Sequence, residues 1–235
     1  MTFAKPADSL KGARILGKEE LKDPKWVHLE GIKWETPNGT QVWVAVCKGE
    51  MAVLTDSSTV WECATRKTRG SAGVDAVAML ALISHPSSKS KPLSTVIVLQ
   101  FRPPVNAICV ELPAGLVDKD EKPEQAGERE LYEETGYKGK TDEVSPVVVS
   151  DPGMTSANMQ LTTIKVELEE GDELKEPEQH LDEGEFVEKR IVALKDLYQT
   201  LLDYNKLGYT VDARRALTKL IMMPYALLIT DNLTG

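Results

Sequence analysis

The chain has 235 residues, a formal net charge of −9 at pH 7 and 41% hydrophobic residues. This hydrophobic content suffices for one sizeable core, whereas the negative charge and the absence of a basic stripe argue against nucleic acid as a partner. The three cysteines, Cys47, Cys63 and Cys109, are widely spaced and form no CxxC pair, so we expect neither a disulfide framework nor a zinc knuckle. With no apolar signal segment and no long apolar run, we expect a protein without a membrane span, in the cytoplasm or alternatively the nucleus.

The first 66 residues predict an arm followed by a small sheet. Residues 1–24 are polar and contain Pro6 and Pro24, which is typical of a loose arm. The following residues alternate in polarity as strands do, and the TPNG sequence at 36–39 favours a tight hairpin turn. We therefore expect a β-meander with strands at 26–34, 41–49 and 60–66.

The rest of the chain, residues 67–235, predicts one α+β domain around a mixed sheet. The expected strands lie at 74–83, 94–101, 106–113, 144–150, 159–168 and 185–192. The expected helices lie at 123–135, 194–208 and 211–229. Two polar loops, at 84–92 and 169–185, separate these elements, and the second is strongly acidic.

The predicted helix at 123–135 gathers acidic side chains on one face, while Leu131, with Ala126 on the same general side, can face the core. Glu130 and Glu134 are four residues apart and Glu133 lies beside both, while Arg129, four residues before Glu133, can pair with it. Clustered carboxylate oxygens are the ligands that Mg²⁺ or Mn²⁺ prefers, and a bound cation would offset the repulsion between them. The alternative is an ordinary solvated acidic face.

The spacing of the whole segment decides between these alternatives. The sequence matches the pattern G-x5-E-x7-R-E-U-x-E-E-x-G-U, in which U is aliphatic or aromatic, through Gly115, Glu121, Arg129, Glu130, Leu131, Glu133, Glu134, Gly136 and Tyr137. This pattern is the Nudix box, and the chain resembles the Nudix hydrolases. The resemblance implies an α/β/α sandwich with a mixed sheet, in which the box forms a loop-helix-loop.

The resemblance also implies a divalent metal site, occupied by Mg²⁺ or alternatively Mn²⁺. It makes Glu130 and Glu134 the leading metal ligands, with Glu133 close behind as a ligand and catalytic group. The backbone carbonyl of Ala114, just before the box glycine, is a further expected ligand. Glu121 and Arg129 are expected chiefly to hold the loop and the helix together.

Sequences outside the box narrow the resemblance. The stretches at 99–118, 150–168 and 182–192 resemble the ADP-ribose pyrophosphatase group, and especially its eukaryotic sugar-nucleotide form, a swapped-domain homodimer. The resemblance implies hydrolysis of ADP-ribose, or of other ADP-sugars, to AMP and a sugar phosphate. Two alternatives stay open, namely hydrolysis of oxidised nucleoside diphosphates and a non-catalytic nucleotide sensor.

Three further residues gain roles from this group. Arg102, in the QFRPP segment, is implied to contact the substrate phosphates, the alternative being a strand-end arginine paired with a surface acid. Glu111 is implied to hold metal-bound water or a ribose hydroxyl. Glu185, in the late acidic loop, is the implied general base, with Glu183 as the reserve candidate.

Base recognition is implied for the N-terminal sheet. In the family, adenine stacks between two tryptophans, one from each subunit of the homodimer. The implied substrate-binding residues here are Trp26, Trp61, Glu62 and Arg66, together with Leu116 of the box. One departure stands out, because residues 40–59 are inserted where the family has a short link. They contain Trp43, which is an alternative to Trp61 as the stacking residue.

Overall fold

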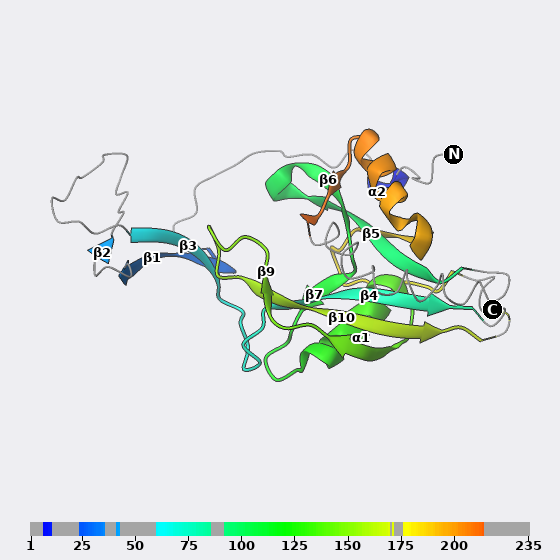
Figure 1. Cartoon of the computed structure of the whole chain (residues 1–235), viewed down its shortest axis with the longest axis horizontal. Coiled ribbons are helices and arrows are strands. Elements are labelled where there is room, and N and C mark those ends of the chain that lie inside the picture. Colours follow the sequence, from blue (N-terminus) through cyan, green and yellow to red (C-terminus); the bar gives the residue numbers. More distant parts are fainter. Residues whose placement is uncertain are drawn as a thin grey trace, which may run out of the picture.

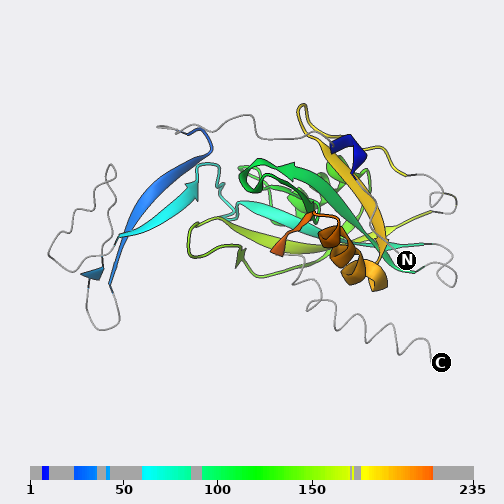
Figure 2. The same ribbon diagram turned by 90° about the horizontal axis from the view of Figure 1, so that it is seen from above.

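A computed structural model describes residues 7–10, 24–35, 41–42, 60–85, 92–169, 171 and 176–213. This part of the chain forms an α+β body with a mixed sheet, as expected, and a separate three-stranded sheet that projects from one end of the body (Figures 1 and 2). None of the helices within those residues is long and apolar enough to cross a membrane.

The projecting sheet is built around its first strand. β1 (Val27–Glu35) pairs antiparallel with β2 (Gln41–Val42) on one side and with β3 (Val60–Arg66) on the other. The order is therefore β2-β1-β3. In the expected meander the second strand would lie in the centre, and this expectation is wrong because β3 pairs with β1, along residues 27–33. The TPNG turn, Trp43 and the rest of the 41–49 strand lie outside the described residues.

The body contains the remaining strands and the two α-helices of the described residues. The strands are β4 (Ala76–Ser84), β5 (Ser94–Arg102), β6 (Ala107–Glu111), β7 (Ala114–Leu116), β8 (Lys140–Val144), β9 (Val148–Val149), β10 (Asn158–Glu167), β11 (Val187–Ala193) and β12 (Thr210–Val211). The helices are α1 (Pro123–Thr135) and α2 (Leu197–Lys206). The strand order is β12-β6-β5-β4-β10-β8, with β11 added to β5, β7 to β4 and β9 to β10. The β10–β4 and β12–β6 pairs are parallel and the others antiparallel, which makes the sheet mixed.

Most expected elements of the body are confirmed to within a few residues, and the structure differs from the expectation in three places. The strand expected at 144–150 is divided into β8 and β9 around Pro146, which lacks the N–H that a continuous ladder needs. Strand β7 was missed because it follows Pro113 directly and reads as a turn. Residue 211, the expected start of a helix, belongs to β12, and the residues after 213 lie outside the description.

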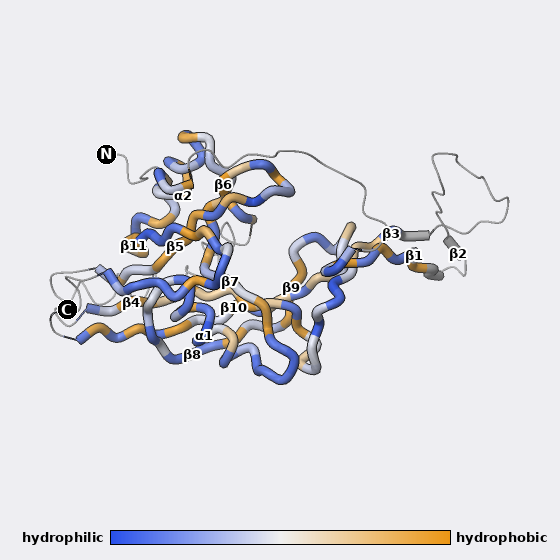
Figure 3. Tube along the Cα trace, turned by 180° about the vertical axis from the view of Figure 1, so that it is seen from behind, coloured by the Kyte–Doolittle hydropathy of each residue, from blue (hydrophilic) through white to orange (hydrophobic). Residues whose placement is uncertain are grey.

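The alternating side chains of the central strands build two hydrophobic layers, one on each face of the sheet. Figure 3 shows hydrophobic stretches along the strands of the body. One layer joins the sheet to α1 through Val77, Met79, Ile83, Val96, Ala126 and Leu131. The other joins it to α2 through Leu80, Ile97, Leu99, Leu197, Leu201 and Tyr204. The helices thus cover opposite faces of the sheet, which is the layering expected of the sandwich.

The N-terminal turn is not loose. Residues Asp8–Leu10 form one 3-10 turn, and Ala7 and Leu10 are buried in the layer that contains α2. The Ala7 N–H donates to the Tyr209 hydroxyl at 2.7 Å, and the Ser9 N–H donates to Glu188 at 2.7 Å. For these four residues the expectation of a loose arm is wrong, because two apolar side chains find a place in the core.

A buried ion pair joins the projecting sheet to the body. Asp75 is 2% exposed, and it accepts hydrogen bonds from Arg69 Nε at 3.0 Å and Nη2 at 2.6 Å. Asp75 and Asn158 also exchange two hydrogen bonds, from the Asp75 N–H at 2.9 Å and from the Asn158 N–H at 3.0 Å. The Ala64 N–H of β3 donates to the carbonyl of Met154 at 2.9 Å, so the sheet is tied to the body at a second point.

The Asp75→Ala variant should lose about 3 kcal/mol of the free energy of unfolding, because it removes the acceptor of the Asn158 N–H and leaves Arg69 only the Ser156 carbonyl. The matched control is Asp142→Ala, which removes an exposed pair with Lys165 of similar length, 2.7 Å, and should lose less than about 1 kcal/mol. Urea denaturation followed by circular dichroism measures both. Equal losses in the two variants would contradict a structural role for the junction.

Candidate active site

Helix α1 presents one apolar and one acidic face. Ala126 and Leu131 are fully buried against the sheet, as the sequence predicted. The helix begins at Pro123, where the Lys122 N–H donates to the Gln125 side chain at 3.1 Å. Burial of the apolar face fixes the rotation of the helix, so the glutamates of the opposite face point toward β7 and the loop that follows it.

Arg129 organises the acidic segment. Its Nε and Nη2 atoms donate to the two carboxylate oxygens of Glu121 at 3.1 and 2.9 Å, and Nη2 also donates to the carbonyl of Leu116 at 3.1 Å. Its Nη1 atom donates to Glu130 and to Glu133, both at 2.9 Å. The predicted Arg129–Glu133 pair is confirmed, and so is the link from helix to loop through Glu121.

Glu134 lies in the most buried part of the cluster. Its side chain is 8% exposed, and one carboxylate oxygen accepts the Ala114 N–H at 3.0 Å. The pKa of Glu134 is raised to about 8, chiefly by burial and also by the charges of Glu130 and Glu185, against the Ala114 N–H and Arg102, which lower it. Burial likewise raises the pKa of Glu130, against the opposing effect of Arg129. The cluster therefore holds more negative charge than its neighbours neutralise.

Gly115 allows Glu130 to reach the loop. A Cβ atom at position 115 would lie 1.8 Å from the carboxyl carbon of Glu130, so no other residue fits there without moving that carboxylate. Strand β7 thereby places the Gly115 backbone against Glu130 and the Ala114 backbone against Glu134. This arrangement of loop backbone and helix carboxylates accounts for the glycine that opens the box.

The donor set fits a divalent cation. Glu130, Glu133 and Glu134 offer hard carboxylate oxygens on one helix face. Arg129 pairs with the first two, whereas Glu134 is buried with no ion-pair partner within hydrogen-bond distance among the described residues. Within the described ranges, no three acidic, histidine or cysteine side chains already stand in a metal-binding arrangement. The reason is visible in the contacts, because Arg129 holds Glu130 and Glu133 and the Ala114 N–H holds Glu134.

Arg102 points to the same place from the end of β5. Its Nε and Nη2 atoms donate to both carboxylate oxygens of Glu111, each at 2.7 Å. The Glu111 side chain is only 4% exposed, so the partner of Arg102 is a buried acid and not the surface acid that the alternative hypothesis expected. The Arg102 side chain is 42% exposed and therefore accessible to a ligand. Since Arg102 and Glu134 affect each other's pKa, the two charges face one site.

Glu185 reaches the cluster from the loop before β11. The Glu185 N–H donates to the Asp182 carbonyl at 3.1 Å, and the Glu185 carboxylate accepts the Asp182 N–H at 3.3 Å. Its charge raises the pKa of both Glu130 and Glu134, so the exposed loop lies at the edge of the cluster. Glu183, the reserve candidate, is exposed in the same turn.

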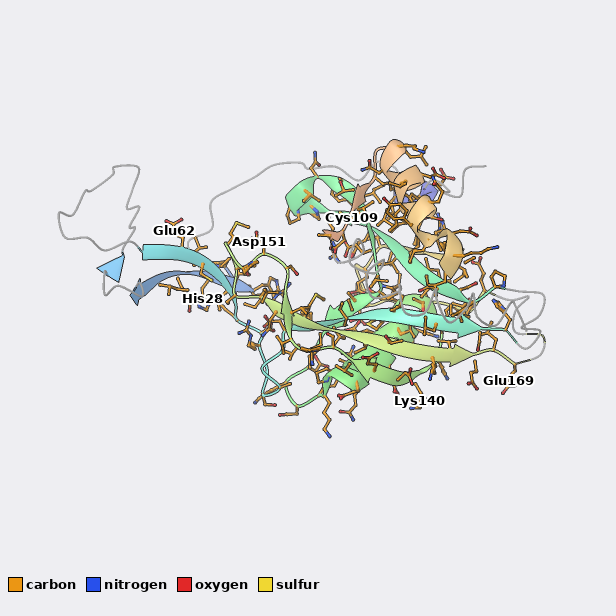
Figure 4. All side chains as sticks on the ribbon, viewed as in Figure 1. His28, Glu62, Cys109, Lys140, Asp151 and Glu169 are labelled. Atoms are coloured by element: carbon orange, nitrogen blue, oxygen red, sulfur yellow. The ribbon has the colours of Figure 1, made fainter. Side chains whose placement is uncertain are left out.

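The residues expected to recognise the base lie elsewhere. Trp26 is 57% exposed next to β1, with Lys25 Nζ 4.2 Å from the centre of its ring. Glu62 and Arg66 lie on β3 opposite Gly31 and Val27, and Figure 4 shows Glu62 on the projecting sheet, away from α1. Trp61 pairs with Ile32 in the same sheet. Within one chain the structure brings the box acids, Arg102 and Glu185 together. Trp26 and the backbone of Trp61 lie beside or in the projecting sheet instead.

Sequence reasoning missed three residues that bind the end of α1. Gln179, His180 and Lys189 donate to the carbonyls of its last turn. These residues lie in or just after a run of acidic residues, and no known motif includes them. The one sequence feature that could have indicated them is the non-acidic pair QH inside EPEQHLDE.

The pKa of Glu134 predicts how the stability of the metal-free protein depends on pH. The unfolded carboxyl titrates near pH 4.5 and the folded one near pH 8, so between these values the native state keeps a proton that the unfolded state has lost. The free energy of unfolding should therefore fall as the pH rises through this window, by up to a few kcal/mol. Glu134→Gln should retain only a smaller slope. Urea denaturation in EDTA at pH 5 and pH 8 measures this, and identical slopes in the two proteins would contradict it.

Comparisons with known proteins agree with this geometry. A NUDIX domain model matches residues 95–212. An uncharacterised Nudix hydrolase of Schizosaccharomyces pombe is 36% identical over 195 residues, covering 83% of this chain and 84% of its own length. The ADP-ribose pyrophosphatase of Saccharomyces cerevisiae is 36% identical over 196 residues, covering 83% and 76%. The ADP-sugar pyrophosphatase of Mus musculus is 30% identical over 219 residues, covering 91% and 89%.

The matched domain contains the whole acidic segment, Arg102 and the Glu185 loop. The similarity to the three relatives covers 83–91% of this chain, so it extends beyond that domain into the N-terminal part. On these grounds the chain belongs to the Nudix hydrolase family.

Proposed function

We propose that this Nudix hydrolase cleaves the diphosphate bond of ADP-ribose, and of other ADP-sugars, to give AMP and a sugar phosphate such as ribose 5-phosphate. The observation that carries the proposal is the pair of half-buried Glu130 and buried Glu134, held against the backbone of β7 and faced by Arg102. The substrate class is supported by the two pyrophosphatase relatives, from yeast and from mouse.

A divalent cation, Mg²⁺ or alternatively Mn²⁺, would be held by Glu130 and Glu134, with Glu133 and the Ala114 carbonyl as further ligands. When bound, such a cation neutralises charge on a diphosphate and acidifies bound water. Arg129 already lies within hydrogen-bond distance of Glu130 and Glu133, so it can keep these carboxylates oriented in either state.

Arg102 is proposed to orient the diphosphate. Glu111 fixes two of its nitrogen atoms from a buried position, which restricts the guanidinium to one plane. A preoriented guanidinium stabilises the charge that builds on the phosphoryl oxygens and loses little side-chain entropy in doing so. Leu116, half-exposed at the end of β7, is proposed to line the same site.

Glu185 is proposed as the proton acceptor. Its carboxylate would take the proton of the attacking water, and the exposed loop allows it to approach once substrate is bound. In the proposal the helix acids are occupied as metal ligands, whereas Glu185 is exposed at the rim of the site. The loop acid is therefore the carboxylate left for the role of base.

The projecting sheet is proposed to recognise adenine in a homodimer. The sheet projects from the end of the body (Figure 2), so we propose that it serves the site of a second subunit, with Trp26 beside β1 and Trp61 in β3. Exposed apolar side chains of this sheet and its anchoring loop, among them Leu29 and Met154, provide a surface for a second copy. Glu62 and Arg66 would contact the base from β3.

Glu134→Gln should lower turnover of ADP-ribose with Mg²⁺ by roughly a hundredfold or more, because the amide can still accept the Ala114 N–H but binds a cation poorly. AMP release measured by chromatography follows the reaction. The matched control is Glu128→Gln on the same helix, where Glu128 binds Lys140 at 2.8 Å outside the cluster, and its turnover should stay near that of the wild type. Normal turnover by Glu134→Gln would remove it from the ligand set, and ADP-ribose binding without AMP release by the wild type would favour a sensor.

Trp26→Ala should raise the KM for ADP-ribose by about tenfold, because stacking of a base on an indole contributes about 1–3 kcal/mol. Tyr198→Ala, which removes an exposed aromatic ring of α2, is the control and should leave the KM unchanged. Light scattering on each variant shows whether the assembly persists. An unchanged KM for Trp26→Ala would exclude this residue from base recognition.

A further inference from the structure

The last turn of α1 is closed by one later segment of the chain. The carbonyls at a helix end have no partner within the helix. Here the Glu133 carbonyl accepts the His180 N–H at 2.7 Å, the Glu134 carbonyl accepts Gln179 Nε2 at 2.6 Å, and the Thr135 carbonyl accepts Lys189 Nζ at 2.9 Å. Two of these carbonyls belong to the proposed metal ligands, so the segment fixes the backbone that carries them.

Gly136 lets this segment lie directly on the helix end. It has a φ of 77°, and a Cβ atom there would lie 2.2 Å from the Glu178 carbonyl oxygen. The His180 ring also stacks on Tyr132 of α1, with 4.4 Å between the ring centres. Contact between the segment and the helix is therefore close on both sides of Gln179.

Gln179 makes a second hydrogen bond that its neighbours do not share. Its Nε2 atom donates to the carbonyl of Val187 at 3.2 Å as well as to that of Glu134. An amide nitrogen carries two hydrogens, so both bonds can form at once. Val187 is the first residue of β11 and follows Glu185 by two positions. One half-buried amide group thus joins the metal-binding helix to the chain next to the loop acid.

We propose that Gln179 is a positioning residue, whose amide fixes the Glu185 loop relative to Glu134. The inference rests on the proposed function, in which these two residues act on one substrate. A general base works only within hydrogen-bond reach of its proton, and a displacement of about 1 Å can reduce the rate by about a hundredfold. The turn of Asp182–Glu185 is exposed and contains Gly184 at a φ of 89°. We therefore expect the hydrogen bonds of Gln179 to be needed to keep the turn in one position.

Gln179→Met tests the proposal, because methionine has a similar volume and no donor. His180→Ala is the matched control, since it removes the ring stacked on Tyr132 and keeps the backbone hydrogen bond to Glu133. In the metal-free proteins, hydrogen–deuterium exchange at residues 181–187 should be faster in Gln179→Met and unchanged in His180→Ala. With ADP-ribose and Mg²⁺, Gln179→Met should lower kcat by roughly tenfold at constant KM.

The double variant with Glu185→Gln separates positioning from a general loss of structure. If Gln179 acts through Glu185, adding Gln179→Met to Glu185→Gln should lower kcat no further. An equal loss in both backgrounds, or unchanged exchange at 181–187 in Gln179→Met, would overturn the proposal. Absence of AMP formation by the wild type would instead contradict the proposed function, and the exchange measurement would still test the tie between the two segments.

Discussion

The hydrogen bonds of Arg129 are the constraint on which the rest of the site depends. One guanidinium binds an acid of the loop, Glu121, and two acids of the helix, Glu130 and Glu133, and it also binds the Leu116 carbonyl. Only a planar group with five donors can serve partners in so many directions. Because of it, loop and helix form one rigid piece, and the carboxylate of Glu130 is held over the backbone of Gly115.

Glu134 is the acid of the cluster to which Arg129 donates no hydrogen bond, so Arg129 does not pair with its negative charge. Its hydrogen-bond donor is the Ala114 N–H, it is buried, and two further acids stand nearby, so the protein gives up stability at neutral pH to keep a carboxylate there. A site whose side chains are arranged against their own electrostatics is typical of function, since stability alone would favour a neutral residue. A divalent cation would relieve the same repulsion, which would link the stability of the fold to the ion of the proposed chemistry.

The sequence predicted those parts of the molecule that short-range patterns determine. The box spacing located α1, its buried Ala126 and Leu131, and the Arg129–Glu133 pair, because helical periodicity relates residues three and four positions apart. It did not predict the central position of β1, strand β7 or the buried Ala7 and Leu10, since strand pairing and docking depend on contacts between distant segments. The sequence did not predict the role of Gln179 for the same reason. Its side chain binds the carbonyls of Glu134 and Val187, which come close together only in the folded chain.

The separation of the projecting sheet from the body divides the proposed tasks. The acids, Arg102 and the Glu185 loop all lie within the NUDIX domain, residues 95–212, whereas Trp26 and β3 lie before it. The two parts meet through the Arg69–Asp75 pair, in which Asp75 is buried, and through the Ala64–Met154 hydrogen bond, and neither contact touches the acidic cluster. Under the proposed function, substitutions in the sheet would change which nucleoside is recognised while the diphosphate chemistry would stay intact. The Arg69–Asp75 pair and the Ala64–Met154 hydrogen bond orient the sheet but do not contact the acidic cluster. Loss of these contacts should therefore impair recognition of the base more than cleavage of the diphosphate bond.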